Sequence, residues 1–213
     1  MRQNRKENPN SLGSSSFNSV GDKQSLAVYF GGEVKHKGNV QEVVTQRGGR
    51  LVVVRDVGVI KASNFGNAHI EGDVQIVETK DHASVSVVGK VDRIDARNSG
   101  RVHVEGDVQR INTSDNASVF VDGNVAKINA RFSGSSYVFG NVESIEVSDH
   151  GTVYVIGSAG NVSANFGGTV FVTRGIGNIS RVEDHSMVKP NYELPDNMRE
   201  YFGRIFPSFD ASK

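Results

Sequence analysis

The chain has 213 residues, and its 24 Lys and Arg residues balance its 24 Asp and Glu residues. A protein that binds duplex nucleic acid needs surplus cations to displace counterions from phosphates, so this balance argues against that class. The sequence contains no cysteine, which excludes disulfides, thiolate metal sites and cysteine nucleophiles.

The first segment, residues 1–20, is polar and opens with MRQNRKENPNSLGSSSF. It lacks the apolar stretch of a signal peptide, and its Ser, Asn and charged residues predict a disordered tail. No apolar run in the chain approaches the roughly 20 residues that a membrane helix needs. We therefore expect a cytoplasmic protein without a membrane span.

A 17-residue repeat follows and occupies residues 21–190. Eight units begin at positions 38, 55, 72, 89, 106, 123, 140 and 157, and the unit at 106 reads GDVQRINTSDNASVFVD. Degenerate units at 21–37 and 174–190 bring the count to ten. A fixed period of this kind predicts a repeat architecture in which neighbouring units stack.

Apolar columns in the repeat indicate which positions face inward. The third and sixth residues of each unit are mostly Val and Ile, as in Val108 and Ile111, and the fourteenth and sixteenth are mostly Val. The three-residue step between the first two columns requires a bend, a small twelfth residue marks a second corner, and the opening glycine marks a third.

These features predict an all-β fold, a single-stranded parallel β-helix with triangular coils. Ten coils of three short strands, spaced at about 4.8 Å, make a rod of about 48 Å. Crossovers between parallel strands are overwhelmingly right-handed, so we expect a right-handed coil.

The two terminal units place charged or polar residues at inward positions. Lys23 and His36 do so in the unit 21–37, which predicts a distorted N-terminal lid built around Leu26, Val28 and Phe30. Arg181 and Lys189 do so in the unit 174–190. Because uncovered sheet edges invite further strands, these charges predict that the ends are closed to strand addition.

Residues 191–213 are expected to form a C-terminal cap with a short helix. Asp196 is a candidate N-cap, and Pro207 follows the helix. The apolar face of this helix is expected to cover the last coil and consists of Met198, Tyr201, Phe202 and Ile205.

Three aspartates stand on one line at alternate corners: Asp81, Asp115 and Asp149. Their separation of roughly 9–10 Å is near that of the carboxylate pair in an inverting glycosidase. However, aspartate before a corner commonly bonds the backbone amides of its own turn, and regular recurrence favours this structural role. We therefore predict no catalytic residue and no enzymatic activity.

Histidines and glycines offer no better site. His82 and His150 adjoin two of these aspartates but lie four coils apart, and His69 and His103 are two coils apart. The glycine-rich stretch Gly167–Asn178 lacks the lysine of a phosphate-binding loop. No metal site and no cofactor are expected.

A basic column is formed by Arg93, Arg110 and Lys127, which could bind an anion. Asp92 and Asp95 flank it. We therefore expect a solvated and neutralised face.

The fifteenth position of the repeat offers the best candidate site, because outward aromatic residues in adjacent coils make a contiguous apolar surface. Such a surface usually contacts a partner. The alternatives are that the rings merely stack across strands or that the C-terminal tail lies over them. We call this surface the aromatic stripe. It consists of Phe120, Tyr137, Phe139, Tyr154, Ile156 and Phe171, and His103 stands at the fifteenth position of the unit before Phe120.

The pattern V-x-G-x-V-x-x-I-x-A in 17-residue coils, with polar tails and no catalytic break, resembles the bactofilins over residues 38–173. The resemblance implies a right-handed triangular β-helix that polymerises end to end into cytoskeletal filaments without nucleotide. The C-terminal helix and the absence of an apolar cluster in the N-terminal tail depart from that family.

The favoured function is a non-enzymatic structural or scaffolding protein that binds a copy of itself or another protein. The aromatic stripe, rather than the ends, is expected to govern this association. One alternative is a carbohydrate- or receptor-binding module of the tail-fibre or adhesin type, whose rings stack on a polysaccharide. An enzyme acting on polysaccharide is the least favoured alternative.

Overall fold

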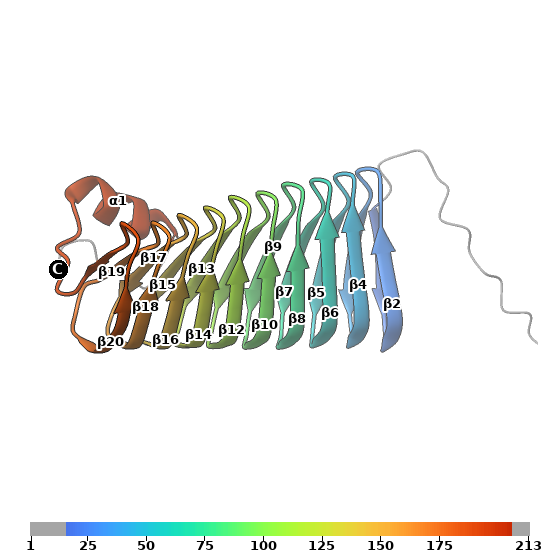
Figure 1. The fold of residues 1–213 in the computed structure, drawn as a ribbon. Coiled ribbons are helices and arrows are strands. Elements are labelled where there is room, and N and C mark those ends of the chain that lie inside the picture. Colours follow the sequence, from blue (N-terminus) through green and yellow to red (C-terminus); the bar gives the residue numbers. More distant parts are fainter. Residues whose placement is uncertain (1–15, 206–213) are drawn as a thin grey trace, which may run out of the picture.

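The computed structural model describes residues 16–205, which wind into a parallel β-solenoid of about ten coils followed by one short helix (Figure 1). Each coil contributes one strand to each of two parallel sheets. The even-numbered strands rise in front in Figure 1, turn at the top and are followed by odd-numbered strands behind, while the coils advance toward the C-terminal end. The coil is therefore right-handed, as the sequence predicted.

The two sheets alternate along the chain. The odd-numbered sheet contains β1 (Ser16–Val20), β3 (Glu33–Lys37), β5 (Arg50–Val54), β7 (Asn67–Glu71), β9 (Ser84–Val88), β11 (Arg101–Glu105), β13 (Ser118–Asp122), β15 (Ser135–Phe139), β17 (Thr152–Ile156), β19 (Thr169–Val172) and β21 (Met187–Lys189). The even-numbered sheet contains β2 (Lys23–Val28), β4 (Val40–Gln46), β6 (Val57–Ser63), β8 (Val74–Thr79), β10 (Val91–Ala96), β12 (Val108–Thr113), β14 (Val125–Ala130), β16 (Val142–Val147), β18 (Ala159–Ala164) and β20 (Ile176–Val182). The helix is α1 (Asp196–Ile205).

Two of the three strands predicted for each coil form one strand with a bend. In β12, Val108 and Ile111 are buried while the two residues between them, Gln109 and Arg110, are exposed. The ladder with β10 pairs residue 91 with 108 and 93 with 110 but skips the pair between them. The bend therefore produces the predicted corner without breaking the strand.

The core consists of stacked columns in which each inward side chain lies on its equivalent one coil away. Ile94 pairs with Ile111, Ile111 with Ile128 and Ile128 with Ile145, and all four are at most 1% exposed. Full burial of such a side chain stabilises the fold by about 1.5–3 kcal/mol. The predicted inward columns are confirmed, and the repetition of this contact holds the rod together.

The opening glycine is required by close approach between coils. Gly106 has φ +151°, and a Cβ at this position would lie 2.3 Å from the carbonyl oxygen of Gly89. Neither the backbone conformation nor the space suits a side chain. Arg55 nevertheless occupies the equivalent position of its own coil, with φ 142°.

The N-terminal end differs from the prediction in two respects. First, β1 pairs with β3, so the solenoid already includes residues 16–20, which were expected to belong to a disordered tail; residues 1–15 lie outside the described residues. Second, Phe30 does not belong to a lid, because it sits at a corner with φ 53° and is exposed. His36 is buried at the expected inward position, and its Nδ1 lies 2.7 Å from the Ser19 Oγ.

The last coil contains one extra residue, which the repeat pattern does not show. Ile179 pairs with Val162, but Arg181 pairs with Ser163, so the ladder has a bulge at Ser180. The Ser180 hydroxyl donates to the Val162 carbonyl at 3.1 Å. The shift turns Arg181 to the outer face, and it brings Val182 onto the inward column of Ala164.

The same shift moves Lys189 away from the core. Lys189 pairs with Phe171 on the outer face, and Val188 pairs with the buried Val170. The prediction that charged residues occupy inward positions in the last coil was therefore wrong.

Candidate interaction surfaces

The aromatic stripe forms on the outer face of the odd-numbered sheet, as its spacing predicts. Phe120, Tyr137, Tyr154 and Phe171 are register partners in successive strands. Their rings stack nearly parallel, with successive centroids 4.8, 5.4 and 4.6 Å apart. The parallel ladder enforces this stacking because it places equivalent residues one strand spacing apart.

The C-terminal tail lies on this stripe. Phe202 of α1 is fully buried, and its ring lies 5.9 Å from Tyr137 and 6.3 Å from Tyr154, edge-on to both. Leu194 is also buried, and Met198 packs into the same cluster. The remaining members of the cluster on the rod are Phe120, Phe139 and Ile156.

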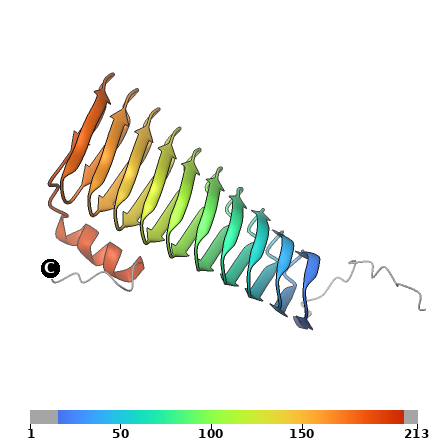
Figure 2. The same cartoon turned by 90° about the horizontal axis from the view of Figure 1, so that it is seen from below.

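The tail runs back along the rod from its C-terminal end toward its middle (Figures 1 and 2). Tyr192 lies 4.5 Å from Phe171, and Tyr201 lies 6.4 Å from Phe120, three coils closer to the N-terminus. Three coils span about 14 Å, close to the ~15 Å length of a ten-residue helix. The segment from Tyr192 to Tyr201, rather than α1 alone, therefore covers the length of the stripe.

The position of α1 corrects the sequence prediction in part. A helix over these residues was expected and is present, but its apolar face packs against the side of the rod rather than the last coil. The chain turns back because the Tyr192 backbone N–H donates to the Val172 carbonyl at 2.8 Å, which starts the tail beside β19. The Ile205 side chain and Pro207 lie outside the described residues.

Burial under the tail changes the chemistry of the stripe tyrosines. Burial is the main cause that raises the pKa of the Tyr137 phenol, and the neighbouring Tyr201 adds to it. Burial also raises the pKa of Tyr154. The stripe is therefore a contact surface whose occupant in this structure is the tail of its own chain.

The ends of the rod expose apolar side chains. Phe17 in the first strand is 58% exposed, and Ile179 and Val182 in the last coil are 46% and 43% exposed. Phe17, Ile179 and Val182 all stand on inward columns, as their register partners show. Within residues 16–205, the ends are thus uncovered, contrary to the expectation that they are closed.

The aspartates of the alternate corners have a structural role, but not the predicted one. Asp81, Asp115 and Asp149 have φ of 54°, 54° and 51°, in the left-handed region that Asp tolerates better than most residues. The Asp115 carboxylate accepts from the Ser114 hydroxyl at 2.8 Å, and Asp149 accepts likewise from Ser148 at 2.7 Å. These carboxylates thus accept from side chains rather than from the backbone amides that the sequence suggested.

A second set of acidic and amide residues escaped the sequence analysis. The second residue of most units accepts a hydrogen bond from the backbone N–H one coil later; Asp107 Oδ1, for example, accepts from Asn124 N at 2.8 Å. The recurring Gly-Asp and Gly-Asn pairs were the available signal. These bonds join Asp22 to Asn39, Asp56 to Asp73, Asp73 to Lys90, Asn124 to Asn141 and Asn141 to Ser158.

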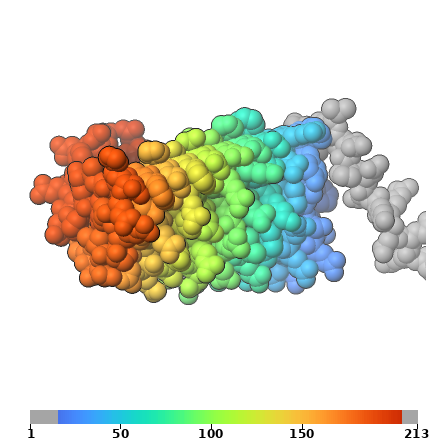
Figure 3. Space-filling view, viewed as in Figure 1, coloured from blue at the N-terminus to red at the C-terminus, as the bar shows by residue number. Residues whose placement is uncertain are grey.

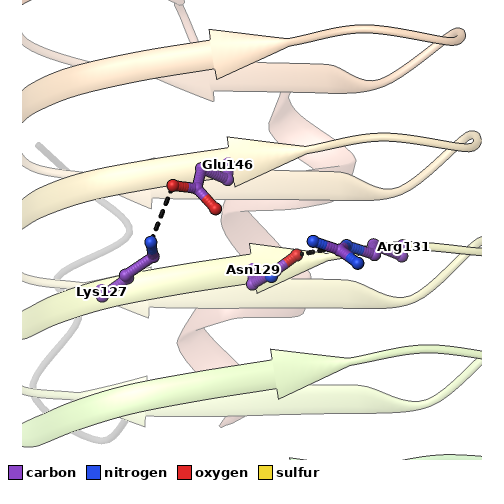
Figure 4. Close-up of polar contacts among 4 residues, drawn as sticks. All are labelled: Lys127, Asn129, Arg131 and Glu146. Carbon is purple, nitrogen blue, oxygen red and sulfur yellow. Dashed lines mark hydrogen bonds and ion pairs between the residues drawn. The ribbon is translucent and has the colours of Figure 1, made fainter.

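The basic column is largely neutralised. Register pairs Arg93 with Arg110 and Arg110 with Lys127, as expected. Arg93 Nε lies 2.8 Å from Asp95 Oδ2, and Lys127 Nζ lies 2.7 Å from Glu146 Oε1 (Figure 4). Figure 4 also shows Arg131 and Asn129, a second polar contact on the same strand face.

The remaining motifs also lie in the repeat. His82 stacks on Phe65 at 5.2 Å, and the glycine-rich stretch contains β19 and the start of β20. The described residues contain no group of three His, Cys, Asp or Glu side chains arranged to hold a metal ion. None of their helices is long and apolar enough to cross a membrane.

Comparisons of the chain with protein-family models, with curated proteins and with solved structures return no match.

Proposed function

We propose that this chain is a non-enzymatic scaffolding rod whose copies associate end to end. The observation that carries the proposal is the state of the terminal coils: inward columns end in exposed apolar side chains at both ends of the described rod. Phe17 stands at one end, and Ile179 and Val182 stand at the other. Exposed apolar groups of this kind at an open sheet edge are the features that natural proteins usually avoid or cover.

The geometry permits continuation of both sheets across such a contact. If the last coil of one copy meets the first coil of the next, β20 lies beside β2 and β21 lies beside β1. Strand direction then stays parallel, as it is throughout the rod. The space-filling view shows the coils as successive bands along the rod (Figure 3), and α1 lies along the side of the last coils (Figure 2).

Sedimentation velocity and electron microscopy of the intact chain test this proposal. We expect particles that are multiples of the single rod and that lengthen with protein concentration. Ile179→Lys combined with Val182→Lys places two charges at the contact and should abolish the end-to-end lengthening of the particles.

A matched control changes exposed apolar residues away from the ends. Phe132 and Phe166 sit at lateral corners and are 57% and 56% exposed. Phe132→Lys combined with Phe166→Lys should leave assembly unchanged. A chain that stays monomeric at every concentration, or end-to-end lengthening that survives the end variant, would contradict the proposal.

The other two functions gain no support from a specific observation. Stacking on sugar rings needs uncovered aromatic faces, and the tail packs on the stripe. The aspartate column is engaged in corner geometry and side-chain hydrogen bonds.

A further inference from the structure

We propose that the tail, residues 190–205, is exchanged between copies, so that α1 of one chain docks on the aromatic stripe of a second and joins two rods side by side. This lateral contact goes beyond the end contact proposed above and uses different residues. The bound segment is already seen on its receptor surface, since α1 occupies the stripe of its own chain.

The tail depends on a stripe for its structure. A helix of ten residues is marginal in water by itself, because nucleation of a helix is costly. Its anchors are Phe202, which is fully buried, and Leu194, which is 9% exposed. A tail that leaves its own stripe therefore gains most by docking on another one with the same contacts.

The hinge favours exchange. It is short, because β21 ends at Lys189 and Tyr192 already contacts the stripe, and Asn191 between them has φ 52°. The Asn191 N–H donates to the Arg174 carbonyl at 3.1 Å, which holds the sharp turn back onto the rod. Short hinge loops invite segment exchange, and an open hinge would release this turn while the docking contacts beyond it are kept.

Reciprocal exchange closes the assembly at two chains. Each tail would bind the stripe of the other chain, and the same surfaces would meet on both sides of a two-fold axis. The contacts within and between chains are the same, so protein concentration and hinge geometry decide the balance between single and paired rods.

A complementation experiment with two full-length variants tests the proposal. The first carries Tyr137→Asp and Tyr154→Asp, which spoil the stripe and leave the tail intact. The second carries Leu194→Asp and Phe202→Asp, which spoil the tail and leave the stripe intact. Both also carry the two lysines that block the end contact, so that end-to-end assembly contributes nothing.

We expect each variant alone to sediment as a single rod and the equimolar mixture to form a one-to-one pair. Replacing the first variant by one that carries Phe132→Asp and Phe166→Asp, with an intact stripe and tail, should reduce pairing at least tenfold, because its own tail competes for its own stripe. A mixture that stays single, although both chains retain the circular dichroism of the rod, would refute the exchange.

A second measurement covers the case in which the stripe variant fails to fold. Otherwise native chains with the two end lysines should pair increasingly as concentration rises, and six Gly and Ser residues inserted after Lys189 should lower that paired fraction by relaxing the hinge. A paired fraction of zero at every concentration, or one that the insertion leaves unchanged, overturns the proposal.

Discussion

Replacing Phe202 with alanine should release the tail without weakening the rod. Phe202 is 0% exposed and is the central anchor of the tail, in contact with two stripe rings. Removal of a buried phenylalanine side chain costs about 3–5 kcal/mol, which corresponds to roughly two to four powers of ten in the docking equilibrium. A short tail whose other buried anchor is Leu194 should not retain its position after such a loss, whereas the core of the rod forms a separate cluster.

Hydrogen exchange of the amides in residues 196–205, together with tryptic cleavage after Arg199 and Arg204, measures release of the tail. Both should accelerate by at least a hundredfold in the Phe202→Ala chain, while the melting temperature of the rod stays within a few degrees. Tyr201→Ala is the control, because Tyr201 is 44% exposed and should contribute much less. Unchanged protection of the tail, or a parallel fall in rod stability, would refute the reasoning.

Three further changes test other parts of the structure. Ile111→Asp should destabilise the rod by several kcal/mol in thermal melts, because it buries an unpaired charge. Arg110→Asp on the outer face is the control and should not destabilise it. Equal melting of the Ile111 variant and the parent would contradict the inward assignment. Asp115→Asn should change stability by less than about 0.5 kcal/mol, since Asn also adopts positive φ, and a larger loss would show that the carboxylate itself matters. Burial raises the pKa of the Tyr137 and Tyr154 phenols. Docking of the tail should therefore be complete below the ordinary phenol pKa of about 10 and be lost as the pH rises through the raised pKa values of the docked state. Protection of the tail that persists after both phenols ionise would contradict this.

The sequence was sufficient to predict the repeating part of the fold. Each inward column repeats the same type of residue in many successive units. Single exceptions, such as the buried Ser136 in a valine column, therefore do not obscure the pattern. The stacking of Phe120 on Tyr137 follows directly from the same period. Parallel pairing with a fixed offset of 17 residues leaves no freedom in these contacts.

The bulge at Ser180 was missed because the degenerate last unit fits either of two registers. A corner signal was nevertheless present. The Asp-His pair of Asp149 and His150 returns at Asp184 and His185, 35 residues later rather than 34, and all four residues have positive φ. Counting corners instead of apolar residues would have located the insertion.

The position of the tail could not be predicted for a different reason. The apolar face of α1 had two apolar surfaces to choose from, the open last coil and the aromatic stripe. Sequence patterns show which side of a helix is buried but not which surface buries it. The backbone hydrogen bond from the Tyr192 N–H to the Val172 carbonyl, which places the start of the tail beside the stripe, has no sequence signature.

The two ends of the rod differ, and the difference determines what kind of contact can join them. At the N-terminal end, β2 pairs regularly with β4, whereas at the C-terminal end the bulge interrupts β20. A bulge in an edge strand disrupts the ladder and hinders pairing with a further strand. An end contact must then depend more on apolar side chains such as Phe17, Ile179 and Val182 than on backbone hydrogen bonds. Because hydrophobic association weakens on cooling, end-to-end particles should shorten between 25 and 4 °C in sedimentation runs. Particles of constant length over that range would show that a continuous backbone ladder joins the copies despite the bulge.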